Sequence, residues 1–254
     1  MTRTAERVAP AVLGAIVLVA WEALVRALAI PPYLLPGPVA IGGAFAADPI
    51  GLLGALLSTL VVTFVALLVA TGIGVLMALA MELSHVARAA IQPWAVVLQV
   101  TPIIAIAPLI VVLAGDAFVA LVACATIVAF FPVFANTVAG LSSAPPELRG
   151  LFRLYGAGRW RTLLLLRLPL ALPYFLAGLR VSGGLALVGA VVAEFVAGSG
   201  GFASGLAYRI LEAGYRLQIP RMFAALVLLA LAGIAINITL GGFARLVLRR
   251  WEQA

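Results

Sequence analysis

Six long apolar stretches restrict what this chain can fold into more than any other feature of its sequence. They span residues 9–30, 50–80, 91–114, 117–141, 170–197 and 222–248. Each is long enough for a transmembrane helix, which needs about 20 predominantly apolar residues. Hydrophobic residues make up 65% of the chain and charged residues 10%, so a soluble domain would lack the polar side chains to cover its surface. The sequence therefore predicts an all-α integral membrane protein, with residues 1–254 forming one transmembrane domain.

The basic residues predict the orientation of these spans. All 16 are arginine. Eleven of them lie in the two termini and the 82–90 and 142–168 loops, which share one side of the membrane, whereas three lie in the loops of the other side. Cytoplasmic loops are enriched in arginine and lysine, so we expect both termini and the 142–168 loop in the cytoplasm. The three outer arginines lie in the 198–221 loop, which we interpret as a short amphipathic helix at the membrane surface or the mouth of the bundle. Charge distributed in this way indicates membrane loops rather than nucleic-acid binding.

The first apolar stretch has a second interpretation. A basic start, an apolar run and the segment Ala27-Leu28-Ala29 also resemble a cleavable signal peptide. Glu22 and Arg26 interrupt the region before that cut, and its removal would leave five spans. We therefore expect residues 9–30 to form the first span, with Glu22 and Arg26 paired four residues apart on one helix face.

The 142–168 loop is the most informative connection between spans. Pro146 suits the first position of a helix, and Glu147 suits its positively polarised end. An apolar stripe follows at helical spacing: Leu148, Leu151, Phe152 and Tyr155. Gly156 and Gly158 are then expected to end this short helix.

This short amphipathic helix has two interpretations. It is compatible with a helix that lies on the lipid headgroups while its arginines contact anionic lipid. It is equally compatible with a projection whose apolar face fits a groove on a cytoplasmic partner. The pattern of residues alone favours neither.

Polar side chains inside the predicted spans mark a candidate translocation path. Such groups are costly within a bilayer and usually face the interior of a bundle or a water-filled path. The candidates are Gln99, Thr101, Asn136, Arg180 and Glu194, with Asn237 and the Glu22–Arg26 pair considered beside them. Arg180 is the most informative, because it needs an anionic or carbonyl partner and is suited to attract an anionic substrate. The alternative for each residue is a structural hydrogen bond between helices or a side chain that snorkels toward the membrane surface.

Enzymatic chemistry has little support in the sequence. The chain has one histidine, His85, and one cysteine, Cys124, and its acidic residues are dispersed. Neither a catalytic triad nor a metal site can be assembled from these residues, so we predict no catalytic residue and no metal. The chain also lacks the glycine-rich loop with Gly-Lys-Ser/Thr that cradles ATP phosphates. An integral membrane enzyme is therefore the weaker alternative to a transport protein.

The segment from Gly156 to Pro169 resembles the cytoplasmic signature of bacterial ABC importer permeases. That signature is Glu-Ala-Ala, three residues, Gly, nine residues, Ile, any residue, Leu and Pro, and Gly156, Leu168 and Pro169 fit its spacing without a gap. The wider chain is similar to the branch that transports nitrate, sulfonates, taurine and thiamine or flavin precursors. The stretches that carry this similarity are 31–36, 101–109, 130–132, 178–180 and 192–195.

The resemblance implies a six-helix type I importer permease in the bacterial inner (plasma) membrane. Two copies would pair, and the short helix of each would insert into one of two ATP-binding subunits, which bind the ATP and Mg²⁺. An extracytoplasmic solute-binding protein would deliver a small polar or anionic substrate. The stretches at 102–108 and 130–136 are most similar to the members that transport thiamine-pyrimidine and flavin precursors.

The chain departs from the signature at one place. Gly150-Leu151-Phe152 stands where the family has Glu-Ala-Ala, so the docking face is bulkier. This departure implies either a matched groove on the ATP-binding subunit or a different partner. It also leaves open a permease-like membrane scaffold that is not coupled to ATP.

Overall fold

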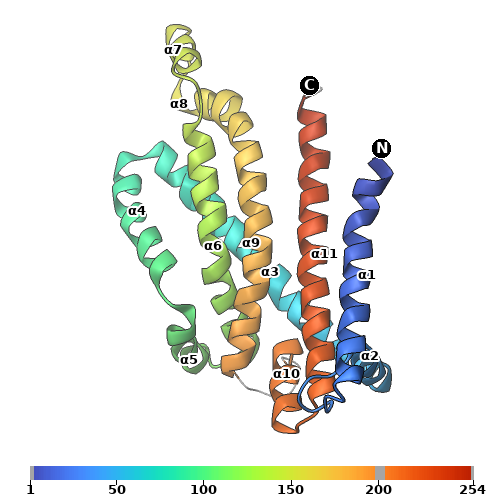
Figure 1. Ribbon diagram of the computed structural model, residues 1–254. Helices are drawn as coiled ribbons and strands as arrows, with labels where there is room; N and C mark the ends of the chain where they lie inside the picture. Colours follow the sequence, from blue (N-terminus) through green and yellow to red (C-terminus); the bar gives the residue numbers. More distant parts are fainter. Residues whose placement is uncertain (1–2, 198–203, 253–254) are drawn as a thin grey trace.

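The computed structural model describes residues 3–197 and 204–252, and all regular structure within them is helical (Figure 1). The helices are α1 (Arg3–Ala27), α2 (Pro38–Ala47), α3 (Pro49–Leu83), α4 (His85–Val100), α5 (Ile103–Ala114), α6 (Ala117–Ser142), α7 (Pro146–Leu154), α8 (Arg159–Thr162), the π-helix η1 (Leu163–Arg167), α9 (Leu168–Ala197), α10 (Leu206–Tyr215) and α11 (Ile219–Glu252). The predicted all-α membrane fold is confirmed.

Five helical segments in the described residues are long and apolar enough to cross a membrane: Val8–Ala27, Pro49–Leu83, Ala117–Ser142, Arg159–Ala197 and Ile219–Arg249. The predicted third span is instead a pair, α4 and α5, bent by 104°. Counting this pair as one span gives the six that the sequence predicts. The break occurs at Pro102, which cannot donate a backbone hydrogen bond, whereas α5 continues through Pro108 without interruption.

Helices α6 and α9 form the centre of the bundle, and α3 crosses behind them (Figure 1). Three glycines bring α6 and α9 into close contact: Gly140, Gly178 and Gly189. A methyl group at any of them would lie between 2.6 and 2.8 Å from the nearest atom of the facing helix. Since lipid tails are as apolar as leucine, helices in a bilayer associate through close packing, and small residues permit it.

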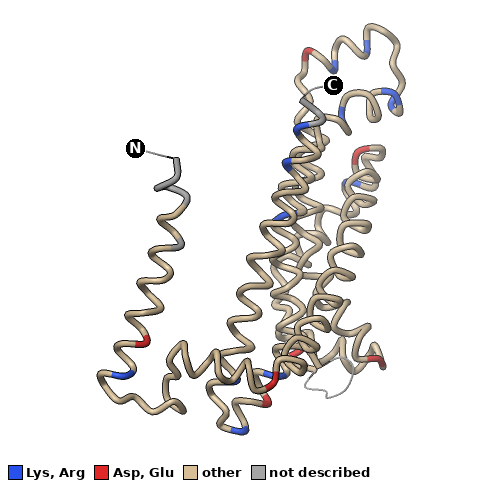
Figure 2. The backbone as a smooth tube through the Cα atoms, turned by 90° about the vertical axis from the view of Figure 1, so that its right-hand side faces the viewer, with Lys and Arg blue, Asp and Glu red and all other residues tan. Residues whose placement is uncertain are grey.

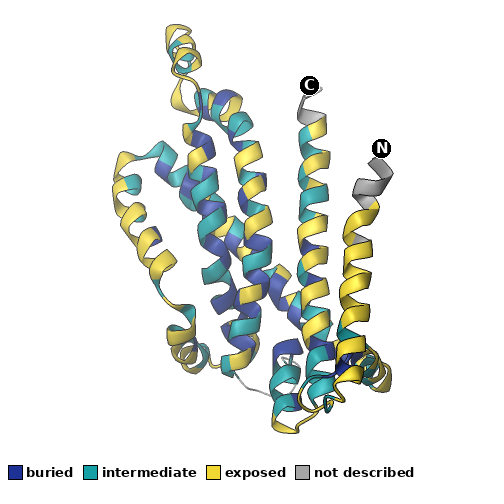
Figure 3. Ribbon diagram, in the orientation of Figure 1, coloured by how far each residue is buried: buried dark blue, intermediate teal, exposed yellow. Residues whose placement is uncertain are grey.

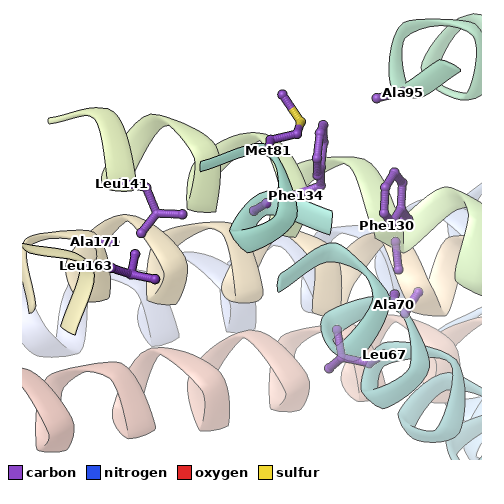
Figure 4. Packing of buried hydrophobic residues seen from close by; sticks show 12 residues of the cluster. Leu67, Ala70, Met81, Ala95, Phe130, Phe134, Leu141, Leu163 and Ala171 are labelled. Atoms are coloured by element: carbon purple, nitrogen blue, oxygen red, sulfur yellow. The ribbon is translucent and has the colours of Figure 1, made fainter. Parts of the chain in front are cut away.

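Larger apolar side chains fill the space around this pair. Figure 4 shows Leu67, Met81, Phe130 and Phe134, which α3 and α6 contribute to one cluster along the length of the bundle. The rings of Phe130 and Phe134 stack with their centroids 5.3 Å apart. This cluster holds α3 against the central pair and continues toward Leu163 at the start of the last turn before α9.

The two ends of the bundle carry most of the charged residues (Figure 2). The start of α1, the end of α11 and the α7–α8 loop lie at one end, whereas α2, α5 and α10 lie at the other (Figure 1). This arrangement places the chain ends and the 142–168 segment on one side, as the arginine pattern requires. That this side is the cytoplasm stays a prediction.

Helix α1 stands apart from the central helices and is joined to them through α2 (Figure 2). Its contact with α11 is at the lower end, where the rings of Trp21 and Phe223 lie 6.3 Å apart. The predicted Glu22–Arg26 pair is present, with Nε of Arg26 donating to Glu22 over 2.7 Å. Glu22 also accepts a hydrogen bond from the backbone of Val39, which ties α1 to α2.

Candidate functional site

The helix predicted in the 142–168 loop is α7, and a Schellman motif ends it. Gly156 has φ of +66°, in the left-handed region where glycine carries no steric penalty. Its N–H donates to the carbonyl of Arg153 over 3.0 Å, and the N–H of Ala157 donates to the carbonyl of Phe152 over 2.9 Å. These bonds satisfy the last carbonyls of α7 and reverse the chain. The glycine of the signature therefore fixes the end of this helix.

Adding one methyl group at Gly156 should loosen this loop. A non-glycine residue in the left-handed region costs about 1–2 kcal/mol, so we expect faster hydrogen exchange at the amides of residues 156 and 157 in Gly156→Ala. Gly150→Ala is the matched control, because Gly150 lies inside α7 with nothing within 4 Å of an added Cβ. There alanine raises helix propensity and should slow exchange. Equal exchange in the two variants would contradict the role assigned to Gly156.

The apolar side chains of α7 are not buried by any part of the chain that the structure describes. None of the residues of α7 is buried, and Leu148 and Leu151 remain 40% and 46% exposed. Leu154, which the predicted stripe omits, is 86% exposed, and Tyr155 is 83% exposed just after the last turn. Figure 3 shows this exposure at the tip of the bundle. The acidic Glu147 lies in the first turn of α7 and Arg153 in its last, as the helix dipole favours.

The second half of the 142–168 segment is part of a long helix. After Gly158 the chain turns helical again at Arg159 and continues through α8 and η1 into α9. The π-helical turn directly precedes Leu168 and Pro169, and Pro169 has no N–H to donate. Leu168 and Pro169 are half-buried, and Leu168 packs against the central core. They therefore anchor the loop to the bundle and do not share the exposed face of α7.

An acidic residue at the end of α3 holds this anchor in place. Glu82 forms ion pairs with Arg167 at the end of η1 and with Arg88 on α4, the latter at 3.5 Å. Only 9% of the Glu82 side chain is exposed. Its carboxylate thus joins α3, α4 and the helix that carries the signature. The sequence shows Glu82 near a basic loop, but it gives no indication of which arginine it contacts.

Glu194 is buried at the opposite end of the bundle. Its Oε1 accepts a hydrogen bond from the hydroxyl of Thr59 over 2.8 Å, and its Oε2 accepts one from the N–H of Ala207 over 2.9 Å. The N–H of Leu206 donates in turn to Thr59 Oγ1 over 2.9 Å. Thr59 and Glu194 thus accept hydrogen bonds from the first two N–H groups of α10, which have no acceptor within the helix. An acidic group is favoured at this end of a helix. Sequence reasoning missed Thr59, which lies within a long apolar run.

Helix α10 confirms the short amphipathic helix predicted in the 198–221 loop, of which residues 198–203 lie outside the described part of the chain. Its arginines are neutralised locally. Arg209 and Arg216 contact Glu212 at 2.8 and 3.0 Å, and Arg221 pairs with Asp48. The pKa of Glu212 is lowered, mainly because Arg209 donates a hydrogen bond to its carboxylate. Each arginine that the 198–221 loop brings to this end of the bundle thus has an acidic partner, as Arg26 of α1 has in Glu22.

Arg180 and Asn237 form the main polar contact between α9 and α11. The guanidinium of Arg180 donates twice to Asn237 Oδ1, over 2.7 Å from Nη2 and 3.3 Å from Nε. Both side chains line a cavity of about 820 Å³, together with Arg245 and apolar residues of the two helices. Since the guanidinium is exposed and the amide is neutral, Arg180 presents a positive charge to this cavity.

The other predicted path residues lie elsewhere. Gln99 is exposed near the end of α4, and Thr101 is half-buried at the α4–α5 bend, with its hydroxyl bonded to the carbonyl of Val97. Asn136 lies between α6 and α9, where its amide donates to the carbonyl of Pro132 over 2.8 Å. The structure therefore does not bring the five candidates together within one chain. Asn136, Arg180 and Glu194 lie at three different helix interfaces, whereas Gln99 and Thr101 lie near the α4–α5 bend.

Comparison with known proteins gives relatives across nearly the whole chain. A probable ABC transporter permease of Haemophilus influenzae is 32% identical over 87% of this chain and 88% of its own length. The formylaminopyrimidine transport permease ThiX of Halalkalibacterium halodurans is 31% identical over 92% of both chains. The riboflavin transport system permease RibX of Chloroflexus aurantiacus is 37% identical over 65% of this chain and 60% of its own length.

A solved structure shares the fold. The chain of an amino acid ABC transporter crystallised with histidines aligns with a TM-score of 0.62 at 20% identity, over 76% of this chain and 92% of that one. The family described as "binding-protein-dependent transport system inner membrane component" matches residues 70–253. These relatives are transport subunits rather than enzymes, which confirms the resemblance seen in the signature. The chain is therefore a multi-pass inner-membrane permease component of an ABC importer and belongs to the binding-protein-dependent transport family.

Proposed function

We propose that two copies of this chain form a homodimeric importer in which each α7 docks on one ATP-binding subunit. The exposed apolar face of α7 carries this proposal. It lies on a helix that projects beyond the spans, and its end is fixed by Gly156 (Figure 1). A rigid amphipathic helix with no apolar partner of its own suits a hydrophobic groove. The partner subunits supply the ATP and Mg²⁺ chemistry.

The position of α7 favours a protein partner over a lipid surface. A helix that binds headgroups lies along the bundle at the level of the span ends. Helix α7 instead extends past α8 and past the end of α11, beyond the level at which the spans end (Figure 1). Lipid contact is instead expected on the apolar surfaces of α1 and of residues 94–100 of α4, which are largely exposed in this chain.

The cavity between α9 and α11 is our proposed part of the translocation path. Its charge at Arg180 suits a substrate with an anionic or electron-rich group, and Asn237 supplies further hydrogen-bonding capacity. Gln99, Thr101 and Asn136 are proposed to complete the path once the second copy is present. Glu194 borders the path only indirectly, because its oxygens are occupied by Thr59 and α10.

The substrate class that we propose is a small heteroaromatic precursor of thiamine or flavin. The names of two relatives, a formylaminopyrimidine permease and a riboflavin permease, support it. A relative named for aliphatic sulfonates is 28% identical, which makes sulfonates such as taurine the second candidate, followed by nitrate. An extracytoplasmic binding protein is proposed to select among them.

Reconstitution with the ATP-binding subunits and binding protein tests this function. We expect hydrolysis in lipid vesicles to rise when the binding protein is loaded with a formylaminopyrimidine or with riboflavin, and to stay basal with empty binding protein. Stimulation by taurine instead would contradict the substrate class and leave ATP coupling intact. Hydrolysis that no loaded binding protein changes would contradict the coupling and favour an uncoupled membrane scaffold.

A further inference from the structure

A basic cavity lies between the corner where α3 meets α4 and the α7–α8 loop. Its volume is about 530 Å³. Its charged lining consists of five arginines and one glutamate: Arg88, Arg149, Arg153, Arg159, Arg167 and Glu82. The single histidine, His85, lines it as well. The residues come from five helical elements, α3, α4, α7, α8 and η1, so the cavity is formed only when the loop folds back onto the bundle.

The positive charge of this cavity is only partly neutralised. Glu82 pairs with Arg88 and Arg167. Among the residues that the structure describes, no acidic side chain forms an ion pair with Arg149, Arg153 or Arg159. Like charges that share a recess repel one another, because water screens them less than at an open surface.

A second observation concerns Arg149, which lines this cavity. Its Nε is buried and has no hydrogen-bond partner. A buried donor without an acceptor is destabilising, so native proteins rarely leave one. A ligand with several acceptor oxygens in the cavity would offset the repulsion and give the Arg149 guanidinium an acceptor.

We propose that this cavity binds a phosphate group, carried either by the headgroup of an anionic phospholipid or by a small phosphate-bearing solute. Arginine recognises phosphate through paired N–H donors, and several arginines converge here. Basic pockets at the ends of transmembrane helices are also suited to lipid headgroups. Both sources present the same chemistry to the protein, and the experiments below distinguish them.

Occupation of the cavity would fix the position of α7. Arg149 and Arg153 belong to α7, Arg159 belongs to α8, and Arg88 belongs to α4. Since no residue of α7 is buried, a bridging phosphate would be a main attachment of this helix to the bundle. The site is thus placed to control how firmly α7 is held, and its existence does not depend on ATP coupling.

Two arginines on α8 provide a matched test. Arg159 lines the cavity, whereas Arg161 does not, and both are exposed. The full chain would be purified in uncharged detergent and titrated with inorganic phosphate at constant ionic strength, with thermal unfolding followed by tryptophan fluorescence. We expect saturable stabilisation whose apparent Kd rises about tenfold in Arg159→Gln and is unchanged in Arg161→Gln. Arg159→Lys should restore much of the affinity if the variants unfold alike without phosphate.

A second arm uses nanodiscs that contain phosphatidylglycerol or only phosphatidylcholine, with retained lipid counted by native mass spectrometry. Retention of phosphatidylglycerol that is lost in Arg159→Gln and kept in Arg161→Gln would support a headgroup site. Stabilisation by inorganic phosphate without such retention would support a solute site. The proposal is overturned if the wild-type chain binds neither probe, or if the two glutamine variants are affected equally in both arms.

Discussion

Leu151→Asp is expected to abolish the stimulation of ATP hydrolysis by loaded binding protein. Leu151 lies on the exposed apolar face of α7, so the change should leave the bundle folded. Placing a carboxylate in a desolvated groove and removing an apolar anchor should weaken docking by at least about 2 kcal/mol, which is about 30-fold in affinity. Co-purification with the ATP-binding subunits and the stimulated hydrolysis rate measure the effect.

Val86→Asp is the matched control for this experiment. Val86 is 79% exposed near the start of α4, at the same end of the bundle as α7, and the change adds the same charge. We expect this variant to co-purify and to respond to binding protein as the unmodified chain does. If both variants lost stimulation, the effect would come from charge at this end of the protein and not from docking of α7.

Glu194→Leu should clearly lower the stability of the protein. Leucine would leave the N–H of Ala207 without an acceptor in a buried site, whereas the Thr59 hydroxyl would keep the Ala55 carbonyl as its acceptor. A buried donor left unsatisfied costs about 1–3 kcal/mol, and a loss of stability of that size is expected. The measurement is thermal unfolding in detergent, together with hydrogen exchange of α10. Protection of α10 that does not change would contradict this role of Glu194.

Gly205→Ala tests the same contact through packing. A methyl group there would lie 2.0 Å from Glu194 Oε1 and 2.3 Å from Thr59 Oγ1, so these side chains would have to separate. Gly42→Ala is the control, because nothing lies within 4 Å of a Cβ at Gly42 on α2. The first change should lower the melting temperature and the second should leave it nearly unchanged. Equal effects would show that the contact is not tightly packed.

The signature loop illustrates how much local pattern predicts. The stripe at Leu148, Leu151 and Phe152 and the glycine that ends the helix were both predictable, because helix periodicity and a left-handed cap depend on neighbouring residues only. The bend in the third span was predictable in position from Pro102. Its angle of 104° was not, because the angle depends on where α4 and α5 pack.

The polar residues of the spans illustrate the limit of that approach. Sequence shows that Glu194 and Arg180 are costly in a bilayer, but it does not show how their polarity is satisfied. Glu194 meets Thr59 across 135 residues of sequence, and Arg180 meets Asn237 across 57. Burial in the bilayer makes such partners necessary, and many polar groups would serve equally well. The sequence therefore names candidate path residues but does not show whether they lie close to one another.

The amino-acid sequence is sufficient to predict a helical membrane protein with an amphipathic helix between two of its spans, because this prediction depends on the lengths and spacing of apolar residues along the chain. The packing of the helices in three dimensions sets which polar groups pair with one another. It made Glu194 a support for α10, joined Glu82 to Arg167, and gathered unpaired arginines into one cavity. These outcomes depend on distances between helices, and packing between helices sets those distances once the spans have formed.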